Sequence, residues 1–105
     1  MKTTIIATAE SWEFWLYIAG QTPKSILALE SITKYSREHI NVKYTIEVID
    51  LLKRPELAEA DEIFAIPTLV RKIPKPLKRI IGDLSNKEKV LTGLNIRPIT
   101  AADGK

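Results

Sequence analysis

The stretch GQTPKS, from Gly20 to Ser25, joins two patterns that together predict how this chain begins to fold. The run before it, EFWLYIA from Glu13 to Ala19, is apolar and aromatic, which is typical of a strand buried on both faces. Within the stretch, Thr22 is a favourable N-cap and Pro23 suits the first position of a helix. We therefore predict a strand, a tight turn and a helix that runs from Pro23 to about Glu38.

The predicted helix carries apolar residues at helical spacing, which indicates one buried face. The expected members of this face are Ile26, Leu29, Ile32 and Tyr35, widened by Leu27 and Ala28. After the helix, residues 42–50 alternate between apolar and polar side chains, so they predict a second strand that ends near Ile49 and Asp50. A strand, a helix and a strand in succession imply a right-handed crossover between parallel strands.

The second half predicts a short helix followed by a hairpin. Pro55 can begin a short helix through ELAEADEIF, which Pro67 ends. The bond before Pro67 can be cis, as is found in structurally required turns. Two strands, 68–72 and 77–81, are predicted to pair antiparallel, because the two prolines in the segment 73–76 require a turn between them.

A final helix is predicted from its start signal. Ser85 and Glu88 form an S-x-x-E capping box with Ser85 as the cap, and Gly93 lies near the expected end of the helix. The complete order of elements predicts a single α/β domain over residues 1–105, in which helices flank one four-stranded sheet. This βαβαββα order is the thioredoxin-like topology. Residues 1–11 and 97–105 are expected to be flexible ends.

Composition limits the classes of function. The 105 residues include 16 Lys and Arg against 13 Asp and Glu, and the net charge of +3 is too small to argue for nucleic acid alone. The chain has no cysteine, which excludes disulfides, thiolate metal sites and thiol catalysis by its own residues. No apolar run approaches the roughly 20 residues of a membrane span, and no signal peptide is recognised. We expect a cytoplasmic protein.

The polar residues do not form a convincing catalytic or metal site. Ser25 would need a base, but His39 is predicted past the far end of the same helix, roughly 20 Å away. We therefore interpret Ser25 as a cap and His39 as a solvated residue at the helix end. The acidic residues of the second helix are interpreted as a solvated face, and they are Glu56, Glu59, Asp61 and Glu62. We expect neither an enzyme nor a bound cofactor or metal.

A basic stretch on the predicted hairpin is the main candidate for binding. It comprises Arg71, Lys72, Lys75, Lys78 and Arg79. Two interpretations remain open, a solvated edge that resists aggregation or a docking surface for an acidic protein partner. RNA is disfavoured because the neighbouring aromatic residues that stacking needs are missing. Of the two tryptophans, Trp15 is expected in the core and Trp12 at a partly buried edge.

Three segments of the chain resemble the KaiB family of bacterial circadian-clock proteins. They are LYIAGQTPKS, EVIDLLKRPELAEADEIFAIPTLV and KRIIGDLSNKEKVLTGL, and the resemblance covers roughly Phe14 to Leu94. It implies a non-enzymatic protein that attaches to the ATPase ring KaiC and helps to sequester KaiA. It also implies two alternative folds, a monomeric thioredoxin-like form that binds and a different α/β form that is commonly a tetramer. The hairpin and the capping box favour the thioredoxin-like form, whereas burial in a dimer or tetramer could favour the other.

The resemblance also assigns roles to individual residues. The partner-binding positions it implies are Lys78 and Arg79, a basic pair of the family, together with Leu27 and Glu62, where members carry Arg and Lys. The structural and fold-switching positions it implies are Pro67, Thr68, Gly93 and Asn95. Because the changes at 27 and 62 remove positive charge, two functions remain open. One is docking on a KaiC-like ATPase, in a clock or a derived stress response, and the other is a thioredoxin-fold signalling or sensor domain with a different partner.

Overall fold

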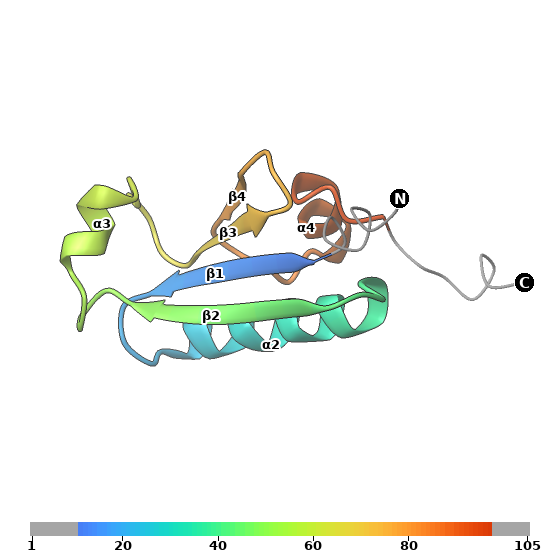
Figure 1. Cartoon of the computed structure of the whole chain (residues 1–105). Coiled ribbons are helices and arrows are strands. Elements are labelled where there is room, and N and C mark those ends of the chain that lie inside the picture. Colours follow the sequence, from blue (N-terminus) through green and yellow to red (C-terminus); the bar gives the residue numbers. More distant parts are fainter. Residues whose placement is uncertain (1–10, 98–105) are drawn as a thin grey trace, which may run out of the picture.

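The chain alternates strands and helices around one four-stranded sheet (Figure 1). The computed structural model describes residues 11–97, so the expectation of flexible ends falls outside the described range except at Ser11 and Arg97. The elements are β1 (Trp12–Ile18), α2 (Pro23–His39), β2 (Tyr44–Asp50), α3 (Glu56–Ala60), β3 (Thr68–Ile73), β4 (Lys78–Ile81) and α4 (Lys87–Gly93). This order confirms the predicted thioredoxin-like α/β fold.

The sheet has the strand order β2-β1-β3-β4, which leaves β2 and β4 at its edges. Strand β1 pairs in parallel with β2 and antiparallel with β3, and β3 pairs antiparallel with β4. The parallel pair is joined through α2, as the predicted crossover requires. The first strand of the described chain therefore lies in the interior of the sheet.

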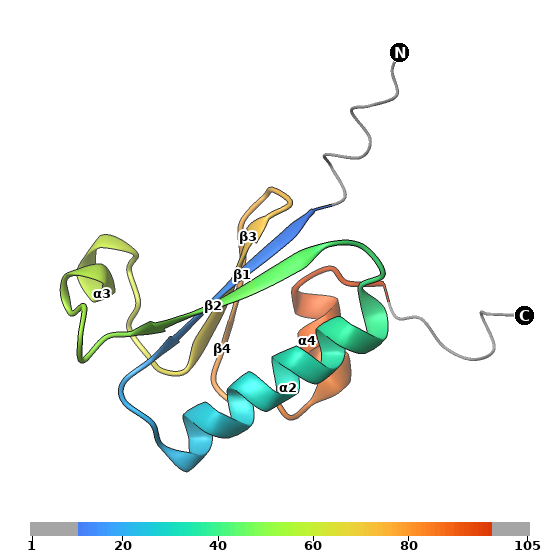
Figure 2. The same ribbon diagram turned by 60° about the horizontal axis from the view of Figure 1, so that its bottom comes forward.

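The main core lies between the sheet and the helices α2 and α4, which share one side of it (Figure 2). Phe14 and Leu16 of β1 alternate inward and are fully buried against Ile32 of α2 and Leu94 after α4. Burial of each such side chain stabilises the fold by about 1.5–3 kcal/mol. Tyr35 adds a polar link, because its hydroxyl donates to the Leu84 carbonyl at 2.9 Å and fixes the approach to α4.

The opposite face of the sheet, which we call the open face, carries a smaller apolar cluster. It contains Tyr17, Ile49 and Val70, and Ile63 after α3 covers it in part. The prediction that Trp15 belongs to the core was wrong, because odd positions of β1 point to this side and its indole is only partly buried. Its Nε1 donates to the Glu13 carboxylate at 2.8 Å.

The turn before α2 follows the predicted capping chemistry. The Thr22 hydroxyl accepts from the Ser25 backbone N–H at 3.1 Å, and the Ser25 hydroxyl accepts from the Thr22 N–H at 2.9 Å. This reciprocal pair turns Ser25 toward the sheet, and the residues that follow it at spacings of three and four are buried too. They are Ala28, Ile32, Tyr35, Ser36 and His39.

Two predictions about α2 were therefore wrong. Ile26 and Leu29 are 47% and 37% exposed, because the buried face is the one set by Ser25 and only an edge strand lies beside their flank. His39 is buried and not solvated, since it falls on that same inward face. Ile32 and Tyr35 are buried as predicted.

Helix α4 begins with a different cap from the one predicted. The side chain of Asn86 accepts from the Lys89 backbone N–H at 3.1 Å, so Asn86 is the N-cap and the proposed capping box of Ser85 and Glu88 does not form. Ser85 instead donates its backbone N–H to the Asp83 carboxylate at 2.8 Å. The helix ends at Gly93 as predicted.

Candidate functional site

Three loops meet at one end of the sheet, which we call the loop end. They follow β1 and β2 and precede β3, and they comprise residues 19–22, 51–55 and 61–67. They meet because β1 and β2 are parallel and β3 runs against β1, and α3 stands at this end (Figure 1). In open α/β sheets, the region beyond the carboxyl ends of the strands is the usual place for a binding site.

A carboxylate ties two of these loops together. Oδ1 of Asp50 accepts from the Gly20 N–H at 2.9 Å and from the Leu52 N–H at 3.0 Å. These hydrogen bonds to the charged form, first that from Gly20, lower the pKa of Asp50. Gly20 has φ +76°, and a Cβ there would lie 3.0 Å from the Leu52 methyl, so both backbone and space favour glycine.

A small cavity of about 160 Å³ lies beside the turn before α2. Its walls include Thr22, Ser25, Ile66 and Pro67, and the Ile66-Pro67 bond is cis. The Ser25 hydroxyl donates to the Thr22 carbonyl at 2.9 Å while it accepts from the Thr22 N–H, so it acts as a cap. His39 lies at the other end of α2 from Ser25.

Large apolar side chains are exposed on the loops of this end. Phe64 is 90% exposed and Leu52 is 71% exposed, and Ile66 between Phe64 and the cavity is also exposed. The loop end carries exposed charges of both signs, since Lys24, Lys53 and Arg54 lie at the start of α2 and on the loop 51–55, and Glu62 lies on the loop of Phe64. An apolar surface with a charged border is characteristic of a protein-docking site.

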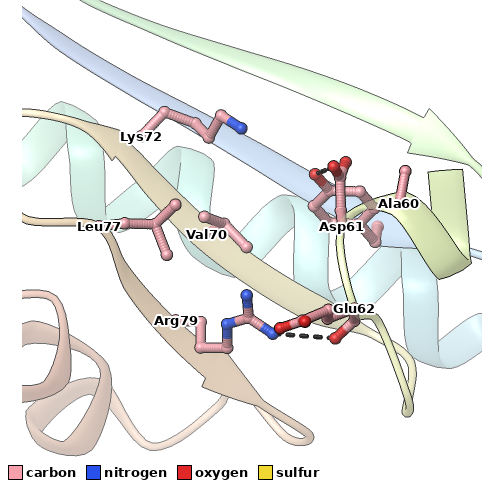
Figure 3. Close-up of a pocket in the computed structure, with 8 residues that line it drawn as sticks. Ala60, Asp61, Glu62, Val70, Lys72, Leu77 and Arg79 are labelled. Carbon is pink, nitrogen blue, oxygen red and sulfur yellow. Dashed lines mark hydrogen bonds between the residues drawn. The ribbon is translucent and has the colours of Figure 1, made fainter.

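The predicted partner-binding residues divide between two sides of the sheet. Arg79 and Glu62 meet on the open face, where Arg79 Nη1 donates to the Glu62 carbonyl at 3.0 Å (Figure 3). Lys78 precedes Arg79 in β4 and shares the alternate face with Ile80, toward the helices. Leu27 is exposed on α2, on that same helical side. The structure therefore brings Arg79 and Glu62 together and does not join Leu27 to them.

The predicted structural positions are tightly held. Pro67 and Thr68 are buried, and the Thr68 hydroxyl donates to the Ala65 carbonyl at 2.6 Å. Gly93 packs directly on Ile80, so that a Cβ at this position would clash with the Ile80 side chain. Asn95 has φ 59°, a left-handed conformation that asparagine tolerates better than most residues.

The sequence interpretation wrongly placed Arg71 on an exposed surface of the hairpin, either a solvated edge or a docking surface. It is 2% exposed and lies on the helical side of β3. Nη1 donates to the Leu94 carbonyl at 2.6 Å and Nη2 to the Pro76 carbonyl at 2.7 Å, and burial lowers its pKa. The strand alternation with buried Leu69 was the signal that could have identified it.

Among residues 11–97, no helix is long and apolar enough to cross a membrane, and no group of three His, Cys, Asp or Glu side chains could hold a metal ion. Fold and site together define a thioredoxin-like domain whose turn before α2 carries Thr22 and Ser25 in place of redox residues.

Comparisons with solved structures agree on the fold. The N-terminal domain of Synechococcus elongatus SasA superposes with a TM-score of 0.66 at 17% identity, covering 78% of this chain and 77% of that one.

Mitochondrial thioredoxin 3 from Saccharomyces cerevisiae has a TM-score of 0.62 at 20% identity, covering 87% of this chain and 83% of that one. The model of the KaiB domain matches residues 15–96. The chain is 51% identical over 81 residues to the circadian clock oscillator protein KaiB of Thermostichus vulcanus, covering 77% of this chain and 75% of the relative. It is 45% identical over 91 residues to that of Prochlorococcus marinus strain MIT 9312, covering 87% of each chain. The chain belongs to the KaiB family.

Proposed function

We propose that this chain is a non-enzymatic, regulatory protein-binding module that docks on a KaiC-like ATPase through its loop end. Membership of a family of circadian clock oscillator proteins supports a clock-related role. The proposal covers docking in an oscillator and docking in a clock-derived stress response, because both use the same physical step. The chain contributes a surface, and the ATPase contributes the chemistry.

The exposure of Phe64 is the observation that carries this proposal. A phenylalanine that is 90% exposed gives up about 1.5–3 kcal/mol of burial, which a partner surface can recover. The loop that holds it is anchored at both ends, by Ile63 in the cluster of the open face and by buried Pro67. An aromatic side chain has only two rotatable side-chain bonds, so it loses little conformational entropy on binding, which suits it to anchor an interface.

The charges of the loop end specify the partner surface further. Lys24, Lys53 and Arg54 favour acidic residues at the border of an apolar partner surface, and Glu62 on the loop of Phe64 favours a basic one. Such charges at a rim mainly accelerate association and lose their effect as salt increases. We therefore expect docking to be faster at low salt than near 150 mM salt.

The test is co-elution of the purified chain with the KaiC-type ATPase of the same genome, in the presence of ATP. We expect a stable complex, and we expect Phe64→Thr to weaken it by about 10-fold or more, since a buried aromatic anchor contributes over about 1.4 kcal/mol. Ile73→Thr is the matched control, because Ile73 is exposed at the opposite end of β3. Equal affinity of the two variants would reject the loop end as the docking surface.

A second candidate function rests on Glu62. Its backbone carbonyl accepts from Arg79, so an acidic residue adjoins one half of the basic pair that the family resemblance implies (Figure 3). If Glu62 met an acidic group of a KaiC-type ring, this like-charge contact would cost several kcal/mol. The position would then exclude such a ring. The chain would then be a thioredoxin-fold signalling or sensor domain with another partner. This alternative would be favoured if the well-folded chain formed no complex after long incubation and if Glu62→Lys restored the complex.

A further inference from the structure

A polar pocket of about 240 Å³ lies on the open face, away from the cavity beside Ser25 (Figure 3). Its floor is made by Tyr17 of β1 and Val70 of β3, and Leu77 closes one side. Asp61 and Glu62, which follow α3, form the opposite side. Lys72 and Arg79 point into it from β3 and β4. The pocket thus joins three segments that are distant in sequence.

Three charged groups of this pocket, those of Asp61, Lys72 and Arg79, each contact a neutral partner. The Tyr17 hydroxyl donates to Asp61 Oδ2 at 2.7 Å, which leaves Oδ1 available. The Lys72 ammonium lies 4.0 Å from the centre of the Trp15 ring. Arg79 gives one of its five N–H groups to the Glu62 carbonyl.

These charges do not neutralise one another. Within residues 11–97, the two cations and the two carboxylates of the pocket form no ion pair at 4.0 Å or less. Opposite charges in the same pocket are therefore held apart in advance of any ligand. Such preorganisation lowers the cost of binding a molecule that carries both signs of charge.

We propose that this pocket binds a small zwitterion of the α-amino-acid class with an apolar side chain. Its ammonium group would bind Asp61, its carboxylate would bind the open N–H groups of Arg79, and its side chain would contact Val70 and Leu77. Lys72, which also lines the pocket, lies across Val70 from Arg79 (Figure 3). A volume of 240 Å³ is below the roughly 300 Å³ of pockets for drug-sized ligands, so the ligand is small.

The pocket is not fully enclosed by its walls, and this sets the expected affinity. A ligand of this size, partly exposed to water, binds with a dissociation constant on the order of 1 mM. Binding at this strength would report the concentration of a metabolite that is abundant in the cell. The proposal does not depend on docking at the loop end, because it concerns the isolated chain.

The experiment is an NMR titration of the full chain with L-leucine, following the Val70 methyl groups and the backbone amides of Asp61 and Arg79. We expect a saturable change in chemical shift. Two analogues separate the charges, since 4-methylpentanoate lacks the ammonium group and isoamylamine lacks the carboxylate. Each analogue should bind at least about 10-fold more weakly, because each leaves one charged group of the pocket unpaired.

Variants locate the site. Arg79→Gln and Asp61→Asn should each weaken leucine binding by about 10-fold, whereas Lys34→Gln, an equal loss of charge on α2, should leave it unchanged. The dispersion of each variant's spectrum shows whether it is folded, and Arg79→Lys gives a second variant that keeps the charge. Absence of saturable shifts in the folded parent chain would overturn the proposal. It would also be overturned if either analogue bound as well as leucine.

Discussion

At the scale of single residues, neighbouring basic side chains of β3 have opposite roles. Arg71 and Lys72 are adjacent in sequence, yet Arg71 is buried under the helices and Lys72 lies over Trp15 on the open face. The guanidinium of Arg71 binds the carbonyls of Leu94 and Pro76, so it connects the end of α4 to the β3–β4 turn. The guanidinium carbon of Arg71 also lies 5.4 Å from the centre of the Trp12 ring.

We expect Arg71→Met to destabilise the protein by about 3 kcal/mol, because it leaves two inward-facing carbonyl groups without their charged donors. Lys72→Met should cost less than about 1 kcal/mol, since it removes only a partly exposed cation–π contact. Urea denaturation of both variants measures the difference in free energy of unfolding. Equal destabilisation would contradict the assignment of Arg71 as a buried connector.

Also at the scale of single residues, we expect low pH to weaken the hydrogen bonds by which Asp50 ties two loops of the loop end together. Hydrogen bonds from Gly20 and Leu52 lower the pKa of Asp50 in the folded state. A lowered folded-state pKa means that the stabilisation is complete above the unfolded value, about 3.9, and is lost as the pH falls through the folded value.

The comparison of the parent chain with Asp50→Asn measures this effect. We expect the parent chain to have the higher melting temperature at pH 6, and the difference between the two proteins to shrink as the pH falls below about 4. A difference that stays constant between pH 6 and pH 2.5 would show that the Asp50 charge does not stabilise the turn.

At the scale of elements, caps decide where the helices begin and which face they bury. The cap of α2 was predictable, because Thr22 and Pro23 leave one plausible start. The cap of α4 was not, because Ser85 and Asn86 are adjacent and both are good caps. The Asp83 carboxylate decides between them, since it accepts the Ser85 N–H and leaves Asn86 to accept from Lys89.

This choice between caps is measurable. Asn86→Ala should destabilise the protein by about 1 kcal/mol, because the N–H of Lys89 loses its acceptor. Ser85→Ala should cost less than that, since its side chain does not cap the helix. Chemical denaturation of the two variants provides the values, and a larger loss from Ser85→Ala would reverse the assignment.

Sequence periodicity predicted the order of the elements but not the inward face of every one. Ile26 and Leu29 have the spacing of a buried stripe, but β2 is an edge strand and no further element covers their flank. His39 and Arg71 are polar residues at inward positions, and only the three-dimensional packing shows that both side chains are buried. In the site, the family resemblance predicted Arg79 and Glu62 as partner-binding residues. Their contact with each other could be seen only in the structure, because 17 positions separate them in the sequence. The exposure of Phe64 had no signal in the sequence at all.

At the scale of the whole molecule, the two sides of the sheet are specialised. The helical side holds the main core and supplies most of the apolar burial. The open face is only partly covered and holds the charged pocket, and the loop end presents Phe64 and Leu52. The two surfaces meet at the loop 61–67, because Asp61 and Glu62 of that loop also line the pocket.

The central place of β1 in the sheet has a consequence for synthesis. Its strand partners end at Asp50 and Ile73, so the segment EFWLYIA cannot pair along both of its edges until Ile73 has left the ribosome. During that interval a largely apolar β-forming segment, whose one charged residue is Glu13, is available to other nascent chains, which is a hazard for aggregation. We expect the yield of native protein to depend on chaperone supply and on translation speed across residues 20–73.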